Sequence, residues 1–237
     1  MKGGLDAVNR NRLKMLAALT MLLDHIALAF LPEASAAYQL LRMIGRLAGP
    51  TMAFFLAEGC IHTRDARRYA LRLGLFALLS WPAFSLFLHG TWPTASFGVI
   101  YTLLLGLAAI QVWKHSDWSR GMRILSVFAL CCLSFFGDWA VFDVLLPLFF
   151  FAFRGDERKK WTAYLLTAVP LAGIPLLLDG TASLYMVGVF AVPLLLRLYN
   201  GENGHQSPFS KWFFYVFYPA HLLLLWWLKL LVTGSSG

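Results

Sequence analysis

The sequence has few charged side chains. Of its 237 residues, 14% are Asp, Glu, Lys or Arg and 59% are hydrophobic. Soluble domains carry about 25% charged residues, so this composition excludes an ordinary soluble protein. Apolar runs of about 20 residues recur without an alternating polar pattern, which favours membrane helices over membrane strands. We therefore predict an all-α, polytopic transmembrane helical bundle.

Cysteine is scarce too, and common catalytic motifs are missing. Cys60, Cys131 and Cys132 lie in or beside apolar runs without metal or redox spacing, so we interpret them as small buried hydrophobic residues. The histidines in predicted loops have no second ligand at metal-binding spacing, so we predict no metal site. The sequence also lacks a glycine-rich phosphate loop, a Gly-x-Ser-x-Gly elbow and a nucleic-acid-binding motif.

Apolar windows separated by polar residues, proline or glycine predict about nine membrane spans. Their ranges are 13–31, 38–60, 69–88, 97–113, 122–136, 138–153, 161–178, 183–199 and 210–232. The fifth and sixth are short and joined only by Phe136-Gly137-Asp138, which also fits a tight hairpin or a re-entrant pair. No remaining segment suggests a second domain, so we predict one transmembrane domain over residues 1–233, with 234–237 typical of a cloning scar.

Basic residues lie in alternate predicted loops. These loops contain almost all of the 20 lysines and arginines, namely Lys2, Arg10, Arg12, Lys14, Arg64, Arg67, Arg68, Arg72, Lys114, Arg120, Arg123, Arg154, Arg158, Lys159, Lys160, Arg197 and Lys211. Because cytoplasmic loops are the positive ones, the N-terminus is predicted to be cytoplasmic and the C-terminus external. This topology explains the net charge of +8 without a nucleic-acid partner.

Two ionisable residues, Asp24 and His25, interrupt the first apolar run. They argue against a cleaved signal peptide, although Arg10 and Arg12 precede the run, so we expect the first helix to be retained. Adjacent helical side chains point about 100° apart, so each residue needs a partner on another helix. Because ionisable groups inside a membrane are costly, they indicate a functional site.

Several other ionisable groups are predicted at a similar depth. At about 1.5 Å per residue, His25 lies about 20 Å from the cytoplasmic surface and Arg46 about 12 Å from the external one. His221 lies about 15 Å deep, and Asp138 and Asp143 begin the sixth span at its external boundary. These positions predict a polar site inside the bundle. The alternative is a set of structural ion pairs or interhelical hydrogen bonds.

A second candidate site lies on the predicted cytoplasmic side. Glu58, His62, Thr63 and Arg64 precede a basic segment that ends at Arg72. Guanidinium groups there could bind an anionic ligand such as a nucleotide phosphate. Positive-inside topology alone is the alternative explanation.

Blocks of sequence along the chain resemble the TraX family, named for a membrane protein that acetylates the N-terminus of conjugative pilin. The matching blocks are Met21–Ile26, Ile44–Pro50, Phe54–Gly59, His62–Asp65, Tyr69–Leu73, Tyr101–Gly106, Gly137–Trp139 and Tyr218–Leu222. Asp24, His25, Arg46, Glu58, His62, Thr63, Arg64, Arg72 and His221 fall on motif positions. Gly49 and Asp143 depart from the pattern, which puts the identity of the acceptor in doubt.

The resemblance implies a multi-pass acetyltransferase of the bacterial cytoplasmic (inner) membrane. Acetyl-CoA would enter from the cytoplasm with its phosphates on Arg64 and Arg72, and transfer its acetyl group to an extracytoplasmic hydroxyl or amine. His25 would act as general base, and Arg46 or the Tyr101 hydroxyl would stabilise the oxyanion. Both direct transfer and an acetyl-histidine intermediate fit the sequence.

The acceptor and the function class are left open at this stage. Pilin N-termini, cell-wall glycans, lipid-linked sugars and small molecules all fit as acceptors, and Asp138, Asp143 and Tyr101 are candidates to bind them. A proton-coupled transporter with Asp24, His25 and other buried charges on its path is the main alternative. The absence of an inverted repeat disfavours it. A scaffold of an envelope complex would not explain the buried charges.

Overall fold

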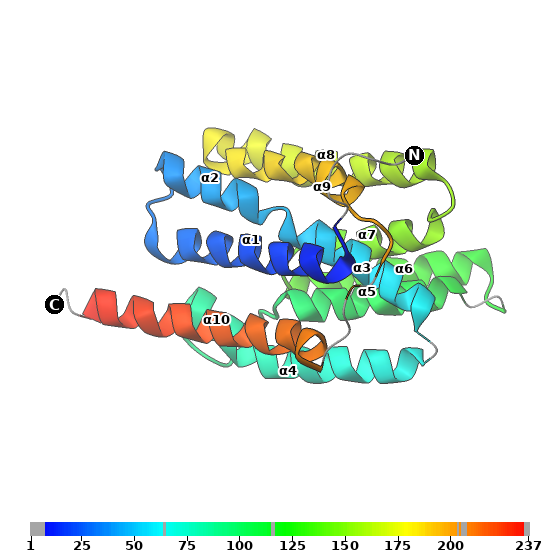
Figure 1. Ribbon diagram of the computed structural model, residues 1–237, viewed down its shortest axis with the longest axis horizontal. Helices are drawn as coiled ribbons and strands as arrows, with labels where there is room; N and C mark the ends of the chain where they lie inside the picture. The colour runs from blue at the N-terminus through cyan, green and yellow to red at the C-terminus, as the bar shows by residue number, and fades with distance from the viewer. Residues whose placement is uncertain (1–7, 64, 115–116, 203, 205–207, 235–237) are drawn as a thin grey trace. The chain divides into compact units, whose positions relative to one another are not determined.

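The computed structural model describes residues 8–63, 65–114, 117–202, 204 and 208–234. Within these residues helices and no strands form the regular secondary structure, and the only β-pairings are two isolated bridges (Figure 1). The elements in chain order are α1 (Arg10–Phe30), α2 (Ala36–Gly45), α3 (Ala48–His62), α4 (Ala66–His89), α5 (Val99–Lys114), α6 (Arg120–Leu133), η1 (Ser134–Phe136), α7 (Phe142–Ala152), α8 (Glu157–Asp179), η2 (Gly180–Ala191), α9 (Val192–Arg197) and α10 (Pro208–Gly234). The all-α prediction is confirmed.

Among the described residues, five segments are long and apolar enough to cross a membrane. They are Arg10–Phe30, Ala36–His62, Ala66–His89, Glu157–Arg197 and Trp212–Val232. Helices α5 and α7 are apolar but shorter. These segments identify the chain as a membrane protein.

The predicted count of nine spans is not confirmed. α7 has 11 residues, a length of about 16 Å, which is roughly half of the hydrocarbon layer. It begins later than the predicted span 138–153 because residues 138–141 form a turn. The predicted spans 161–178 and 183–199 form one continuous apolar stretch, in which Gly180 at φ +60° separates α8 from the 3₁₀ helix η2.

The chain divides into two compact units. Unit 1 comprises Met1–Met52 and Pro170–Phe217, and unit 2 comprises Ala53–Val169 and Tyr218–Gly237. Helices α3, α8 and α10 contribute residues to both units. The single domain over residues 1–233 stays a prediction.

Polar side chains determine where several helices begin. Asn9, Ser35, Asp65 and Ser119 each accept the backbone N–H three residues further on, at the starts of α1, α2, α4 and α6. Such N-caps satisfy donors that have no partner inside the helix. α4 ends at Gly90, whose φ of +71° suits glycine at a helix C-terminus.

The predicted span 38–60 is broken between α2 and α3 at Arg46 and Leu47. Pro50 explains the break, because it has no N–H to donate to the carbonyl of Arg46 four residues earlier. Proline is tolerated in the first turn of α3, where no such bond is required. As a result Arg46 lies at the C-terminal end of α2, where its side chain reaches Asp24 of α1.

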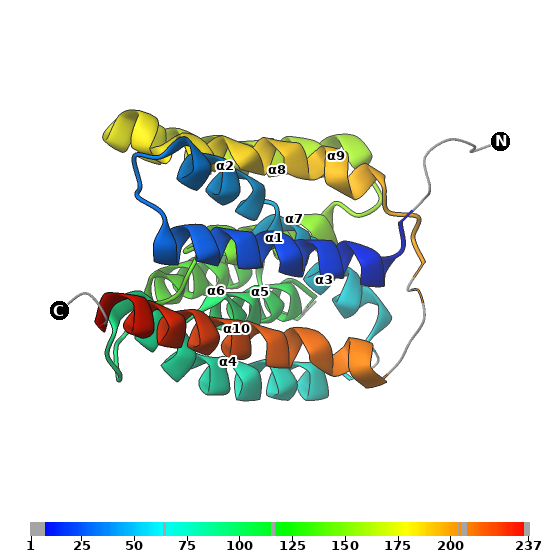
Figure 2. The ribbon, with the colours of Figure 1, turned by 60° about the vertical axis from the view of Figure 1, so that its left-hand side comes forward.

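In unit 1, α2 packs between α1 and η2 (Figures 1 and 2). Glycine allows the close approach on both sides. A Cβ added to Gly45 would lie 2.3 Å from the Cβ of Asp24, and one added to Gly188 would lie 2.1 Å from the carbonyl oxygen of Met43. Small residues at such contacts are typical of helix packing in membranes.

In unit 2, α5 packs against α4, α6 and α7. Gly106 of α5 permits the contact with α7, because a Cβ there would lie 2.4 Å from the carbonyl oxygen of Asp143. The interpretation of the cysteines as buried holds for Cys60 but is wrong for Cys132, which is exposed, and Cys131 is half-buried. An exposed apolar face on α6 fits a helix that meets lipid, where a thiol needs no protein partner.

Candidate functional site

A buried carboxylate held by two arginines lies at the contact between α1 and α2. Both oxygens of Asp24 accept hydrogen bonds from Arg46 Nη2 at 2.7 Å, and Oδ2 also accepts one from Arg42 Nη1 at 2.8 Å. Asp24 is only 5% exposed. Charge-assisted bonds of this length are strong, and removing one partner of a buried pair costs about 3–5 kcal/mol.

Two tyrosines flank the arginines. The ring of Tyr185, in η2, lies 4.6 Å from Arg42 Cζ and 5.4 Å from Arg46 Cζ. Tyr38 lies 5.7 Å from Arg42 Cζ and packs edge-on against Tyr185. We call Asp24, Arg42, Arg46, Tyr38 and Tyr185 the Asp24 cluster. Cations are stabilised over aromatic faces, so the tyrosines help to hold both guanidinium groups in a largely apolar surrounding.

Gln39 fixes Tyr185 against α2. Its Nε2 donates to the carbonyl of Ala182 at 2.8 Å, and its Oε1 accepts the backbone N–H of Tyr185 at 3.0 Å. One amide side chain therefore satisfies two backbone groups of η2. This amide bridge places the tyrosine ring against Arg42 and Arg46.

His25 lies beside Asp24 in sequence and is 7% exposed. The expectation that Asp24 finds its partners on another helix is confirmed, because both arginines belong to the α2 segment. Arg46 and His25 lie in unit 1, whereas His221, Asp138 and Asp143 lie in unit 2. One common site for these five residues stays a prediction.

A second buried carboxyl group lies in unit 2. Asp143, in the first turn of α7, has no exposed surface, and its Oδ2 lies 2.9 Å from Thr102 Oγ1 of α5. The same hydroxyl lies 2.9 Å from the carbonyl of Val99, so its single proton has two acceptors in reach. Asp143 Oδ1 is buried without a hydrogen-bond partner. Such an orphaned oxygen is uncommon in a folded interior and indicates a polar point in the bundle.

Other predicted residues gather near Asp143 within unit 2. The Tyr218 hydroxyl accepts the backbone N–H of Val99 at 3.2 Å and interacts electrostatically with the carboxyl groups of Asp138 and Asp143. The ring of Tyr218 contacts that of His221, with centroids 5.8 Å apart. Unit 2 thus brings together Asp138, Asp143 and His221 through a tyrosine that the sequence analysis did not select.

The backbone of the turn before α7 is unusual. Trp139 and Val141 have φ values of +54° and +67°. Positive φ is rare for a β-branched residue such as valine, and strained backbone of this kind is concentrated at functional sites. Ser134 stabilises the turn by accepting the backbone N–H of Val141 at 2.7 Å. The strain supports Asp138 as a candidate functional residue, because Asp138 lies in the same turn.

The Tyr101 hydroxyl is hydrogen-bonded within the protein. Its hydroxyl donates to the carbonyl of Leu133 at 3.1 Å, and its ring packs against Phe97 with centroids 4.8 Å apart. An oxyanion-stabilising role would require this bond to be exchanged for one to the substrate.

The predicted donor-site residues belong to unit 2, apart from Arg64, which lies outside the described residues. His62 Nε2 lies 3.9 Å from Glu58 Oε2 across one turn of α3, and Thr63 donates its backbone N–H to the carbonyl of Gly59. Arg72 lies over the ring of Tyr69 at 5.4 Å. These residues follow one another along α3 and the start of α4.

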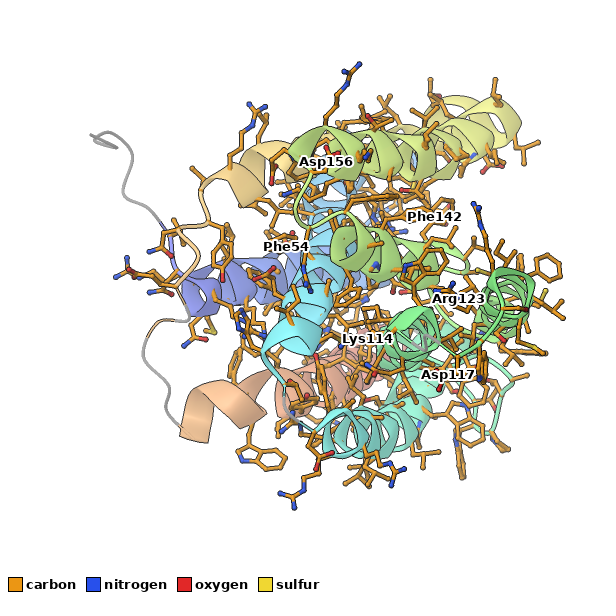
Figure 3. All side chains as sticks on the ribbon, turned by 90° about the vertical axis from the view of Figure 1, so that its right-hand side faces the viewer. Phe54, Lys114, Asp117, Arg123, Phe142 and Asp156 are labelled. Atoms are coloured by element: carbon orange, nitrogen blue, oxygen red, sulfur yellow. The ribbon has the colours of Figure 1, made fainter. Side chains whose placement is uncertain are left out.

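Further cations lie at the end of α5 and beyond (Figure 3). Lys114 donates to the carbonyl of Cys60 at 3.2 Å and lies over the ring of Phe151 at 4.9 Å. Arg154 lies over the same ring at 5.2 Å, and Arg123 lies over Trp113 at 5.5 Å. Because Lys114 bonds to the C-terminal turn of α3, positive charge is placed beside the Glu58–Thr63 segment. This end of unit 2 therefore suits phosphate groups.

Sequence reasoning missed Arg42, Tyr185, Gln39 and Tyr218. A signal existed for Arg42, because it is one of the few basic residues outside the basic loops and precedes Arg46 by one helical turn. No signal in the sequence marks Gln39 or Tyr185, because their contacts join segments separated by 146 residues.

Comparisons with known proteins identify related sequences. The profile of the TraX protein family matches residues 9–229. The chain is 32% identical over 237 aligned residues to the probable fimbrial assembly protein FimC, serogroup H1, of Dichelobacter nodosus, with 90% of this chain and 93% of that protein covered. No solved structure matches the chain.

Proposed function

Since the chain belongs to the TraX family, we propose that it is a bacterial inner-membrane acetyltransferase that modifies an extracytoplasmic hydroxyl or amine. The name of the relative, a probable fimbrial assembly protein, favours a pilus-type protein as the acceptor. The observation that carries the proposal is a buried histidine beside a doubly paired carboxylate inside a membrane span. Ionisable groups in this setting are costly to keep without a function.

The paired arginines support different roles for Asp24 and His25. Three charge-assisted hydrogen bonds occupy both oxygens of Asp24, which suits this carboxylate to positioning Arg42 and Arg46. His25 is then the general base on α1. It takes the proton of the attacking hydroxyl or amine, a contribution of about 10²–10⁴-fold. His25 afterwards returns this proton to the departing sulfur.

Acetyl-CoA, when bound, supplies the thioester whose carbonyl carbon forms the new C–O or C–N bond while its C–S bond breaks. The residues at the basic end of unit 2 fit its phosphates. Arg72 and Lys114 belong to α4 and α5, and Lys114 bonds to the end of α3, the helix that carries Glu58 and His62. These cations bind and orient the donor from the cytoplasmic side of the predicted topology.

The test is acetyl-CoA binding to the detergent-purified full chain, measured by calorimetry beside a transfer assay. We expect Arg64→Ala and Arg72→Ala to weaken binding at least about tenfold, because hydrogen bonds to charged groups are lost. Arg158→Ala is the control, since Arg158 is an exposed arginine at the start of α8, outside the predicted donor segment. His25→Ala should bind acetyl-CoA normally yet lose transfer by about 10²-fold or more.

Two results would contradict the proposal. Unchanged turnover in His25→Ala would remove this residue from the mechanism. A folded preparation that does not bind acetyl-CoA at saturating concentration would favour a proton-coupled transporter, which pH-dependent flux in reconstituted vesicles would then test.

A further inference from the structure

The Asp24 cluster carries more positive than negative charge. Two guanidinium groups face one carboxylate, and Asp24 is the only carboxylate that interacts with Arg42 in the described part of the chain. Glu33, an exposed residue, interacts electrostatically with the Tyr38 hydroxyl and not with Arg42. A surplus charge in an apolar surrounding is costly until an anion neutralises it.

Arg42 has hydrogen-bonding capacity left over. Its Nη1 donates to Asp24 and the guanidinium also bonds to Tyr185, but its Nε is buried without a hydrogen-bond partner. A guanidinium has five N–H donors in a planar fork that matches carboxylate or phosphate oxygens. The side chain of Arg42 as a whole is 11% exposed, so part of it lies at the surface of the structure.

The position of Arg42 along α2 indicates the side from which a ligand arrives. α2 follows the loop 32–37, which lacks basic residues and is predicted to be external. Arg42 lies four residues beyond Tyr38, or about 6 Å deeper along the helix. In this topology the phosphates of a cytosolic donor would bind on the cytoplasmic side. The Asp24 cluster lies nearer the external side, from which the acceptor would arrive.

We propose that the Asp24 cluster binds an anionic group, a carboxylate or a phosphate, carried by the extracytoplasmic acceptor. This inference depends on the proposed function, because it names the chemical class of the acceptor for that site. Arg42 supplies the new ion pair, Asp24 keeps both arginines in place, and Tyr185 with Gln39 fixes the guanidinium plane. The pilus-type acceptor favoured above would therefore carry an anionic group, such as an acidic side chain, near the hydroxyl or amine that is modified.

The experiment uses inorganic phosphate and acetate as probes. Thermal unfolding of the full chain in neutral detergent is followed as each anion is added, against sodium chloride of equal ionic strength. We expect a saturable rise in Tm for the wild type, because a ligand that binds only the folded state stabilises it. In Arg42→Gln the apparent Kd for the anion should rise at least about tenfold. Arg42→Lys, which keeps the charge, should lose less of the affinity for the anion.

Arg158→Gln, a substitution of an exposed residue, is the control and should respond like the wild type. No anion-specific rise in the wild type overturns the proposal, whether or not the variants fold. An equal rise in Tm with the anion in wild type and Arg42→Gln would also overturn the proposal.

A lipid headgroup is the other possible source of the same chemistry. Nanodiscs of phosphatidylcholine, with and without phosphatidylglycerol, separate the two sources. Stabilisation by phosphatidylglycerol that depends on Arg42, without any effect of phosphate or acetate, would assign the cluster to lipid and overturn the acceptor proposal. Acetyl-CoA binding is measured on the same preparations. If it is absent while the anion effect remains, the acetyltransferase proposal fails, whereas the converse result removes only the anion site.

Discussion

Gly45 is the residue at which the packing of α1 against α2 can be tested most directly. A Cβ at this position would lie 2.3 Å from the Cβ of Asp24 and 2.4 Å from its Oδ1. Ordinary contacts of a Cβ begin near 3.4 Å, so Gly45→Ala forces the two helices apart by about 1 Å. Rotation of the Asp24 side chain cannot relieve the clash, because its Cβ is fixed to the backbone.

The expected cost follows from this displacement. Replacing glycine by alanine within a helix normally stabilises it by about 0.5–1 kcal/mol. Overpacking costs about 1–3 kcal/mol, and a shift of about 1 Å would also stretch the 2.7 Å bonds from Arg46 beyond hydrogen-bonding distance. We expect a net loss of about 2–3 kcal/mol, which lowers Tm by about 4–12 °C for a chain of this size.

The assay is thermal unfolding of purified Gly45→Ala in detergent, together with the transfer reaction. Gly173→Ala is the matched control, because Gly173 lies inside α8 in the same unit and a Cβ there meets nothing within 4 Å. The control should be as stable as the wild type or slightly more stable. If Gly45→Ala behaves like Gly173→Ala, the close contact between α1 and α2 at Asp24 is refuted.

Two further predictions concern other carboxyl groups. Asp143→Asn keeps the shape of the side chain and the hydrogen bond from Thr102, so Tm should change by less than about 4 °C. If the carboxyl group binds the acceptor, the rate of acetyl transfer should fall at least about tenfold. Full activity in this variant would exclude that role. Asp156 accepts the backbone N–H of Lys159 at the start of α8, and this bond lowers the pKa of Asp156 below its ordinary value of 3.8. The bond therefore stabilises the fold above about pH 4 and is lost as the pH falls through the lowered pKa, so Asp156→Ala should unfold at a lower temperature than wild type at pH 7 and at the same temperature near pH 2. A difference in unfolding temperature that persists at the lower pH would show that the ionised carboxylate of Asp156 is not the source of the added stability.

Much of the fold follows from hydrophobicity alone. Runs of apolar residues predicted the helices α1, α4 and α10 closely, because a span needs a fixed length of apolar chain. The count of spans failed at α7 and η2. Hydropathy does not register a turn such as 138–141 or the start of a 3₁₀ helix at Gly180, since both lie in equally apolar surroundings. Short helices are stabilised by tertiary packing, which a linear pattern does not contain.

The candidate site was predictable where charged residues interrupt apolar runs, because burying a charge in a membrane costs free energy. Asp24 and Arg46 stand out as charges in apolar runs, and the structure pairs them. The support around them was not predictable, because Gln39 and Tyr185 are ordinary residues in isolation. Their importance comes from two backbone groups of η2 that need a partner. Such needs appear only once the chain is folded.

Two of the close glycine contacts imply different evolutionary constraints. The neighbour of Gly188 is the backbone carbonyl of residue 43, which every amino acid possesses, so no exchange at position 43 can make room for a larger residue at 188. The nearest neighbour of Gly98 is instead the hydroxyl of Tyr218, which phenylalanine would remove, leaving two ring carbons at 3.2 Å that a small shift of the ring would relieve. Among descendants of this sequence, position 188 should stay glycine on every lineage. Position 98 can drift to alanine wherever residue 218 has first lost its hydroxyl, so these two positions should change as a pair.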